Sequence, residues 1–251
     1  VDHNINEQAW PLFMKSGWAG AGIKRHICVL NKEDLEKLAG KMCPGSKVFK
    51  GVSSERNCFK FEKIKRIGSE FDAFWRVVKN RFPITIERTA KYLNWRYADC
   101  PLIKYHIFDV KKGNQIKAFL VLRIEEITDG LNRKLTGIKI GRIIDLVSDG
   151  DCDKIVLLNT IKFCIKQKIG LIDFFLTGNF YNDVLESLDF VNCDMPPYDL
   201  IPTLLNPINR VKRMKHNFAF KLMNKKYSRK DIGNFDNWYT TKGGGDQDRP
   251  Y

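Results

Sequence analysis

One acidic residue stands in the middle of a strongly apolar run. Asp145 interrupts Ile143–Val147, whose other residues are isoleucine, leucine and valine. An ionised carboxylate is costly to bury there unless it is paired or faces a cleft. One interpretation is a general base whose pKa is raised by its apolar surroundings. The other is a structural ion pair, for which Arg96 and Arg123 are candidate partners.

The segment directly after this run, SDGDCDK (148–154), combines one glycine with three acidic residues. It is superficially similar to a calcium loop, but it lacks the glycine and the distal glutamate at the required spacing. The seven cysteines are scattered without a CxxC pair, and the four histidines show no metal or triad spacing. We therefore predict reduced thiols and no metal site.

The composition indicates a globular chain with a basic balance. Hydrophobic residues make up 43% of the 251 residues and aromatic residues 12%, which predicts a packed core. The apolar runs are too short to span a bilayer and no secretory signal opens the chain, so we expect a cytoplasmic protein. The net charge of +14 favours an anionic partner. Nucleic acid is the weaker candidate, because no recognised nucleic-acid-binding motif accompanies the charge.

Periodicity predicts the elements that would position Asp145. Alternation of apolar and polar residues indicates strands, and apolar residues at helical spacing indicate helices. The predicted strands are 26–30, 58–67, 104–110, 115–127, 139–147, 171–177, 199–205 and 237–242, and the predicted helices are 33–38, 69–81, 87–97, 154–168 and 179–188. The strand at 139–147 and the strand at 171–177 enclose a helix, so we expect them to be parallel.

From residue 58 onward, this element order resembles that of the GNAT acyltransferase superfamily. The resemblance implies an α/β fold with a mixed central sheet flanked by helices. The segment NFYNDVLESLDF is similar to the superfamily's Asn…Leu-Tyr-x-x-x-Gly-Phe helix, although Leu185 and Asp189 replace its Tyr and Gly. The segment PLFMKSGW (11–18) matches that pattern better. Residues 1–41 therefore resemble the tail of an earlier GNAT repeat, 42–57 a linker and 58–251 the acyltransferase domain.

Three further segments resemble a bacterial GNAT subgroup that acylates amino sugars, including nucleotide-linked sugars made for surface polysaccharides. They are FWRVVKNRFP, YLNWRY and the terminal NWYTTKGGGDQDRPY. The leading hypothesis is an N-acyltransferase that moves an acyl group from acetyl-CoA or another acyl-CoA to such a sugar. The alternatives are a non-catalytic GNAT-like module for nucleic acid or a partner protein, and an acetyltransferase for a small amine or antibiotic.

The resemblance also implies a cofactor site. In the superfamily the fourth strand binds the pantetheine arm, and the next helix N-terminus holds the pyrophosphate. The matching residues are Ile144, Leu146 and Val147 for pantetheine, and Gly150, Asp151, Cys152, Lys154 and Asn179 for the rest of the cofactor. The loop departs from the family's Gln/Arg-x-x-Gly-x-Gly/Ala pattern, because its acids repel pyrophosphate and Lys154 is the only local cation. Either more distant basic residues help, or CoA binding is degraded in this half.

Catalytic and acceptor residues follow from the same resemblance. Asp145 would deprotonate the amine, and Tyr239 would protonate the leaving thiolate, since Leu185 leaves the usual acid position vacant. Trp95 would stack on a base or sugar and Arg96 would pair with phosphate. The residues expected at the acceptor are Asn94, Trp95, Arg96, Asp246, Gln247, Asp248 and Arg249, the last four folded back by Gly243–Gly245. Core or ion-pair roles remain the alternatives for Trp95, Arg96 and Tyr239.

Overall fold

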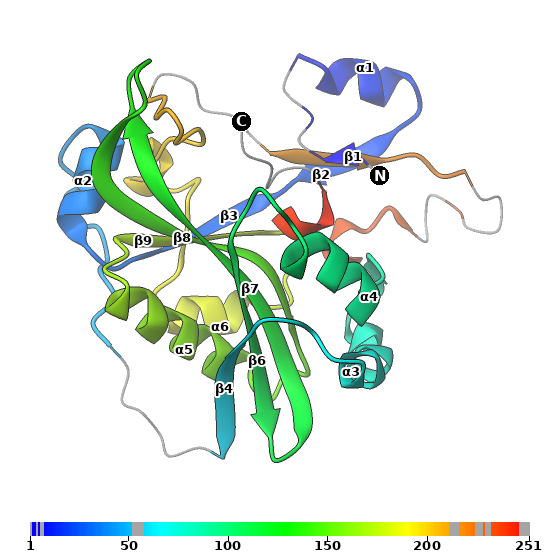
Figure 1. Cartoon of the computed structure of the whole chain (residues 1–251). Coiled ribbons are helices and arrows are strands. Elements are labelled where there is room, and N and C mark those ends of the chain that lie inside the picture. Colours follow the sequence, from blue (N-terminus) through cyan, green and yellow to red (C-terminus); the bar gives the residue numbers. More distant parts are fainter. Residues whose placement is uncertain are drawn as a thin grey trace.

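The computed structural model describes residues 2–3, 5, 8–51, 58–210, 216–223, 228 and 232–245. Within these residues, a mixed sheet runs through the molecule in the strand order β10-β3-β9-β8-β7-β6-β4 (Figure 1). Its strands are β3 (Lys24–Val29), β4 (Phe59–Ile64), β6 (Tyr105–Lys112), β7 (Gln115–Asp129), β8 (Lys134–Ser148), β9 (Leu171–Leu176) and β10 (Val191–Asn192). Neighbouring strands are antiparallel except β8 and β9, whose predicted parallel pairing is confirmed.

Smaller elements surround this sheet. A second sheet has the order β1-β11-β2 and a third joins β12 to β5; these are β1 (Asp2–His3), β2 (Ala19–Gly22), β5 (Ile84–Thr85), β11 (Asn217–Phe220) and β12 (Trp238–Tyr239). The α-helices are α1 (Trp10–Lys15), α2 (Lys32–Ala39), α3 (Glu70–Val78), α4 (Ala90–Leu93), α5 (Asp153–Lys166) and α6 (Asn182–Ser187). The 3-10 turns are η1 (Lys79–Arg81), η3 (Tyr198–Leu200), η4 (Phe235–Asn237) and η5 (Lys242–Gly244), and η2 (Asn94–Ala98) is a π-helical turn. None of the described helices has the length and apolar character needed to cross a membrane.

Helices cover both faces of the sheet. Phe119 on β7 packs against Phe71 of α3, with ring centroids 5.2 Å apart. Phe108 on β6 packs against Phe163 of α5 at 5.0 Å. Because Asp109, the residue after Phe108, pairs with Phe119, the two rings point to opposite faces. Thus α3 and α5 sandwich the sheet, as Figure 1 also shows.

The N-terminal segment contributes an interior strand, next to the edge strand β10, to this sheet. β3 lies between β9 and β10 and pairs with β9 from Lys24 to Val29. The predicted linker at 42–57 therefore does not separate two sheets, and its residues 52–57 lie outside the described part. The strand that occupies the edge of β9 away from β8 thus comes from the first 41 residues.

The end of the described chain also differs from the prediction. Residues 199–205 form no strand, and only Trp238–Tyr239 of the predicted strand 237–242 pairs regularly, with β5. Further along the chain, Thr241 forms an isolated antiparallel bridge with Leu176 of β9. Because Leu176 already pairs with Lys24 of β3, this bridge lies on the other edge of β9, which faces β8.

β8 and β9 separate towards their carboxyl ends. Their parallel pairing runs from Ile140 with Leu171 to Ile143 with Phe174 and stops there, although β8 continues to Ser148. On the other edge of β8, the register with β7 shifts at Ile144, which is a β-bulge. The bulge and the separation together create a wedge between β8 and β9 that positions the site described next.

Candidate functional site

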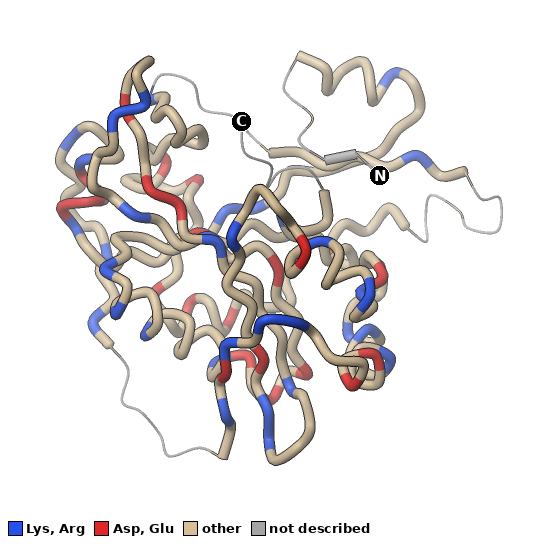
Figure 2. Tube along the Cα trace, viewed as in Figure 1, with Lys and Arg blue, Asp and Glu red and all other residues tan. Residues whose placement is uncertain are grey.

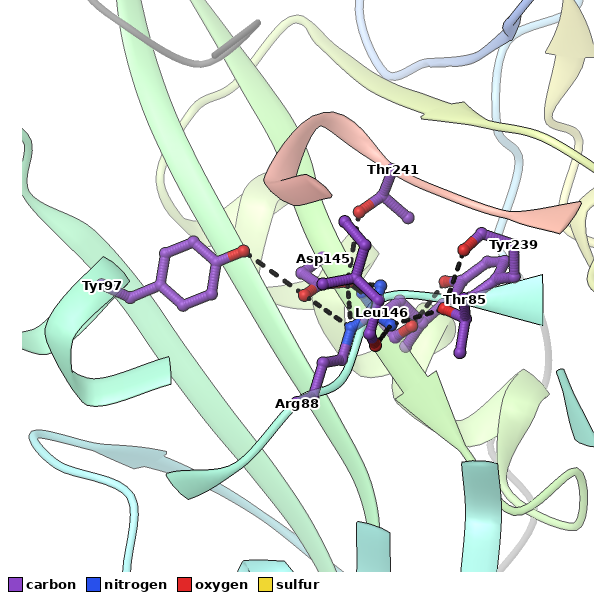
Figure 3. A network of polar contacts seen from close by, with 8 residues as sticks. Thr85, Arg88, Tyr97, Asp145, Leu146, Tyr239 and Thr241 are labelled. Atoms are coloured by element: carbon purple, nitrogen blue, oxygen red, sulfur yellow. Dashed lines mark hydrogen bonds and ion pairs between the residues drawn. The ribbon is translucent and has the colours of Figure 1, made fainter. Parts of the chain in front are cut away.

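Asp145 lies beside the wedge and forms a buried ion pair with Arg88 (Figure 3). The Arg88 Nε lies 3.0 Å from Oδ2 and its Nη2 lies 3.1 Å from Oδ1. The exposed fractions of Asp145 and Arg88 are 2% and 1%. Burial lowers the pKa of Arg88, but the neighbouring carboxylate more than offsets this, so the pKa is raised above its ordinary value.

Other donors complete the coordination of this carboxylate. Tyr97 Oη donates to Oδ2 at 3.3 Å, Thr241 Oγ1 to Oδ1 at 3.2 Å, and the Leu146 amide to Oδ1 at 3.1 Å. Both oxygens are therefore occupied and shielded. This geometry favours the ion-pair interpretation of Asp145 over the general-base interpretation, because neither oxygen faces an open cleft.

The partner is neither of the two arginines expected from the sequence. Arg123 pairs with Glu125 at 3.5 Å, and Arg96 donates to the carbonyl of Gly245. Arg88 reaches Asp145 because it follows β5, and its Nη1 donates to Thr85 Oγ1 at 2.7 Å. Sequence reasoning missed Arg88 because several arginines lie in this part of the chain and no spacing rule selects one of them.

Tyr239, in β12 near the end of the described chain, contacts β8 at the wedge. Its hydroxyl donates to the Leu146 carbonyl, and its ring stacks on Phe82 with centroids 4.3 Å apart. Burial raises the pKa of Tyr239 well above its ordinary value, with Tyr181 and Asp145 adding to the effect. The phenol therefore holds its proton firmly. In this arrangement Tyr239 fastens the C-terminal segment to β8, and its predicted acid role stays a prediction.

The acidic loop after β8 is neutralised by cations from distant parts of the chain. Arg81 of η1 binds Asp153 through two contacts of 2.8 and 2.5 Å. It also donates to the carbonyls of Ser148 and Phe180 at 3.0 and 2.9 Å. Lys117 of β7 lies 3.1 Å from Asp149. These contacts fit the first of the two possibilities given above, in which basic residues distant in the sequence compensate the acids of the loop.

The remaining cofactor candidates surround the same loop. Cys152 precedes α5 and is buried, and burial raises the pKa of its thiol to about 12, so it is not a thiolate. Gly150, Asp151 and Lys154 are exposed. Asn179 follows β9 and accepts from Lys24 Nζ at 2.8 Å. The structure therefore gathers the predicted cofactor residues at the wedge and the α5 N-terminus.

The predicted acceptor residues are more dispersed. The Asn94 side chain makes two hydrogen bonds with the backbone of Ile67: its Oδ1 accepts from the amide and its Nδ2 donates to the carbonyl, each at 2.9 Å. These contacts give Asn94 a structural role. Trp95 is 65% exposed, so the core alternative for it is wrong. Arg96 holds Gly245, the last described residue. The tail residues Asp246, Gln247, Asp248 and Arg249 lie outside the described part of the chain.

Gly243 packs tightly against this site. A β-carbon on Gly243 would lie 2.1 Å from Tyr97 Oη and 3.1 Å from the Ile144 carbonyl. We expect Gly243→Ala to lower the free energy of unfolding by about 1–3 kcal/mol, as overpacking does in a filled core. Gly22→Ala is a suitable control, because its β-carbon would meet a neighbour only at 3.7 Å. Equal denaturation midpoints for the two variants would contradict the placement of Gly243.

Comparisons with known proteins bear on the fold. No protein-family model and no curated protein matches the sequence. An N-myristoyltransferase of Saccharomyces cerevisiae, solved with bound myristoyl-CoA and inhibitors, aligns with a TM-score of 0.52 and 14% identity, covering 79% of this chain and 48% of its own. A GCN5-related N-acetyltransferase from Anabaena variabilis gives a TM-score of 0.40 at 9% identity, covering 68% of this chain and 37% of its own.

A conserved Staphylococcus epidermidis protein of unknown function gives a TM-score of 0.44 at 7% identity, covering 87% of this chain and 69% of its own. This chain spans about half the length of the N-myristoyltransferase. At 14% identity, that likeness concerns the fold alone. The chain has the mixed α/β, GNAT-like fold that the sequence predicted.

Proposed function

We propose that this chain is, or is part of, an acyl-CoA-dependent N-acyltransferase of the GNAT type. The observation that carries the proposal is the wedge between β8 and β9, with a bulge at Ile144 and the start of α5 directly after it. Backbone of β8 that makes no ladder pairing with β9 suits an extended pantetheine arm, and a helix N-terminus suits pyrophosphate. The fold shared with a myristoyl-CoA-bound N-myristoyltransferase adds support.

The reaction would join an amine to the acyl group of the thioester. The amine nitrogen, once deprotonated, attacks the thioester carbonyl carbon; the new C–N bond forms, the C–S bond breaks, and the thiolate takes up a proton. Backbone amides near the bulge would stabilise the oxyanion. Ile144, Leu146 and Val147 would align the pantetheine, although the Leu146 carbonyl already accepts from Tyr239.

Roles for the charged residues follow from their contacts. Arg81 and Lys117 would offset the acids of the loop, so that Gly150, Asp151, Cys152 and Lys154 could border the pyrophosphate. Asp145 would act as a positioning residue, because Arg88 and three other donors already bind its oxygens. In this proposal the amine loses its proton to water or to another group, and Asp145 holds β8 in register with the C-terminal segment.

In its more specific form, the proposal makes the acceptor an amino sugar that is linked to a nucleotide. The net charge of +14 supports substrates that carry phosphates, since both CoA and a nucleotide diphosphate are polyanions. Figure 2 shows basic residues interspersed with acidic ones along the described elements. The exposed Trp95 supplies a ring on which a base or sugar could stack.

Thermal unfolding in the presence of acetyl-CoA tests the proposal. A ligand at 100 times its dissociation constant stabilises the native state by about 2.7 kcal/mol, so the midpoint should rise with acetyl-CoA concentration. ATP at equal concentration controls for non-specific anion binding to a basic protein. A rise with ATP that equals the rise with acetyl-CoA, or no rise at millimolar acetyl-CoA, would remove the support for a transferase.

The second candidate is a non-catalytic GNAT-like module. The observation that favours it is the packing of aromatic rings at the wedge, where Tyr239 stacks on Phe82 and lies 5.7 Å from Tyr181. Rings in this place occupy space that a thioester would need. The sequence feature that suits such a module is the Lys/Arg-rich stretch 210–230, of which 11 of the 21 residues lie outside the described part of the chain. Absence of acetyl-CoA binding in the thermal experiment would favour this module.

A further inference from the structure

The backbone of β8 at the wedge is already bonded to other groups of the protein. The Leu146 carbonyl accepts from the Tyr239 hydroxyl, and the Leu146 amide donates to the Asp145 carboxylate at 3.1 Å (Figure 3). A β-carbon on Gly243 would lie 3.1 Å from the Ile144 carbonyl, so Gly243 packs directly over that oxygen. Strand-like binding of a pantetheine arm needs free backbone groups. In the described state the arm therefore has no free partner at Ile144 or Leu146.

The groups that cover these two carbonyls belong to one segment, residues 238–243, which we call the latch. On one side the latch pairs with β5 over two residues. On the other it meets β9 through the isolated bridge between Thr241 and Leu176, and through Thr177, whose amide donates to the Thr240 carbonyl at 3.0 Å. Among the described residues, no ladder joins the latch to β8. The latch thus fills the wedge without being a regular strand of the large sheet.

Side-chain hydroxyl groups supply much of the attachment of the latch. Tyr239 and Thr241 both donate to groups of β8, the latter at 3.2 Å. Thr177 Oγ1 donates to the Trp238 carbonyl at 2.7 Å. On the β5 side, Thr85 Oγ1 donates to the Tyr239 carbonyl at 2.8 Å. Each hydrogen bond of this kind changes an equilibrium constant by only about two- to tenfold. A segment held by such single contacts opens at a lower cost than a strand held by a long ladder.

Arg81 covers a further part of β8, but in a different way. Its Nη1 donates to the Ser148 carbonyl at 3.0 Å, and the same guanidinium balances Asp153. Removal of Arg81 would therefore leave an acid facing the ligand. Removal of the Tyr239 hydroxyl frees the Leu146 carbonyl and leaves every charge at pH 7 unchanged. The contact of the latch can thus be released without altering the electrostatics of the site.

We propose that the latch is an autoinhibitory contact: it closes the wedge in the free protein, and acyl-CoA displaces it from β8. A pantetheine amide N–H then takes the place of the Tyr239 hydroxyl at the Leu146 carbonyl. A ligand that binds only the open state has its affinity reduced by the fraction of open molecules, so the latch sets how tightly acyl-CoA binds. This proposal rests on the transferase function proposed above and adds the regulation of its cofactor site.

Calorimetric titration of the full chain with acetyl-CoA tests the proposal through Tyr239→Phe. Phenylalanine keeps the ring that stacks on Phe82 at 4.3 Å and removes only the hydroxyl. We expect acetyl-CoA to bind Tyr239→Phe about two- to tenfold more tightly than the parent chain. The matched control is Tyr198→Phe, in which a second buried tyrosine loses a hydroxyl that accepts from the Lys47 amide. Its affinity for acetyl-CoA should equal that of the parent chain.

The outcomes separate the latch from the transferase function. Equal or weaker binding by Tyr239→Phe overturns the latch and leaves the transferase standing. Tighter binding by both tyrosine variants also overturns the latch, because the effect is then not specific to the wedge. If neither the parent chain nor Tyr239→Phe binds acetyl-CoA at millimolar concentration, the transferase proposal fails and the latch fails with it.

Hydrogen exchange of the full chain, with and without saturating acetyl-CoA, gives a second readout. In the closed state the Thr240 amide donates to Thr177 Oγ1 at 2.9 Å. If acyl-CoA displaces the latch, peptides that cover 238–243 should exchange about threefold faster or more with ligand, while binding slows exchange along β8. Slower or unchanged exchange of the latch peptides shows that the latch stays in place, and overturns the proposal whatever the effect of Tyr239→Phe.

Discussion

Asp145→Asn should lower the free energy of unfolding by about 3–5 kcal/mol, because it leaves the guanidinium of Arg88 buried without its counter-charge. For a chain of this size, that corresponds to a fall in the melting temperature of roughly 6–20 °C. Chemical denaturation followed by tryptophan fluorescence measures the change. Asparagine keeps the size of the aspartate side chain, so the effect reports charge rather than packing.

Two further variants make this measurement decisive. Asp99→Asn is the matched control, since Asp99 pairs with the exposed Arg66 and should hardly change the midpoint. Arg88→Met/Asp145→Leu should recover most of the lost stability, because apolar replacement of a buried pair is often neutral. If Asp145→Asn unfolds like the parent chain yet loses acyl transfer, Asp145 is a general base and the positioning role is wrong.

The sequence predicted the strands around Asp145 better than it predicted their partners. Alternation and buried apolar runs placed β6, β7, β8 and β9 correctly, because each pattern is local to its strand. The pairing of β3 with β9 joins residues about 150 positions apart and leaves no mark on either segment. The strand at 26–30 was therefore expected from its composition, but its place between β9 and β10 was not.

The same distinction applies to the site. Asp145 was detectable because a carboxylate in an apolar strand needs a local explanation. Its partner Arg88 was not, because the contact joins residues 57 positions apart in the sequence. Likewise, the loop acids were read as repelling pyrophosphate, whereas Arg81 and Lys117 neutralise two of them from η1 and β7. Long-range ion pairs thus offset the negative charge that a local count of the loop indicates.

Arg81→Met should weaken acetyl-CoA binding by about 100-fold, or roughly 2.7 kcal/mol, if the α5 N-terminus holds the pyrophosphate. The change leaves Asp153 ionised beside the phosphates without the two contacts that now balance it. Methionine retains an apolar stem, which preserves part of the packing of Arg81 on Tyr181. Isothermal titration at constant ionic strength measures the affinity, because screening would otherwise mask a charge effect.

A double variant tests whether Arg81 acts on acetyl-CoA binding by neutralising Asp153. Arg81→Met/Asp153→Asn removes the unbalanced carboxylate together with its partner, so most of the affinity should return if Arg81 acts by neutralising Asp153. If the double variant stays as weak as the single one, the contacts of Arg81 with the Ser148 and Phe180 carbonyls shape the loop instead. If Arg81→Met binds acetyl-CoA as tightly as the parent chain does, the α5 N-terminus is not the pyrophosphate site. The charges brought to this loop from η1 and β7 would then serve the fold rather than a ligand.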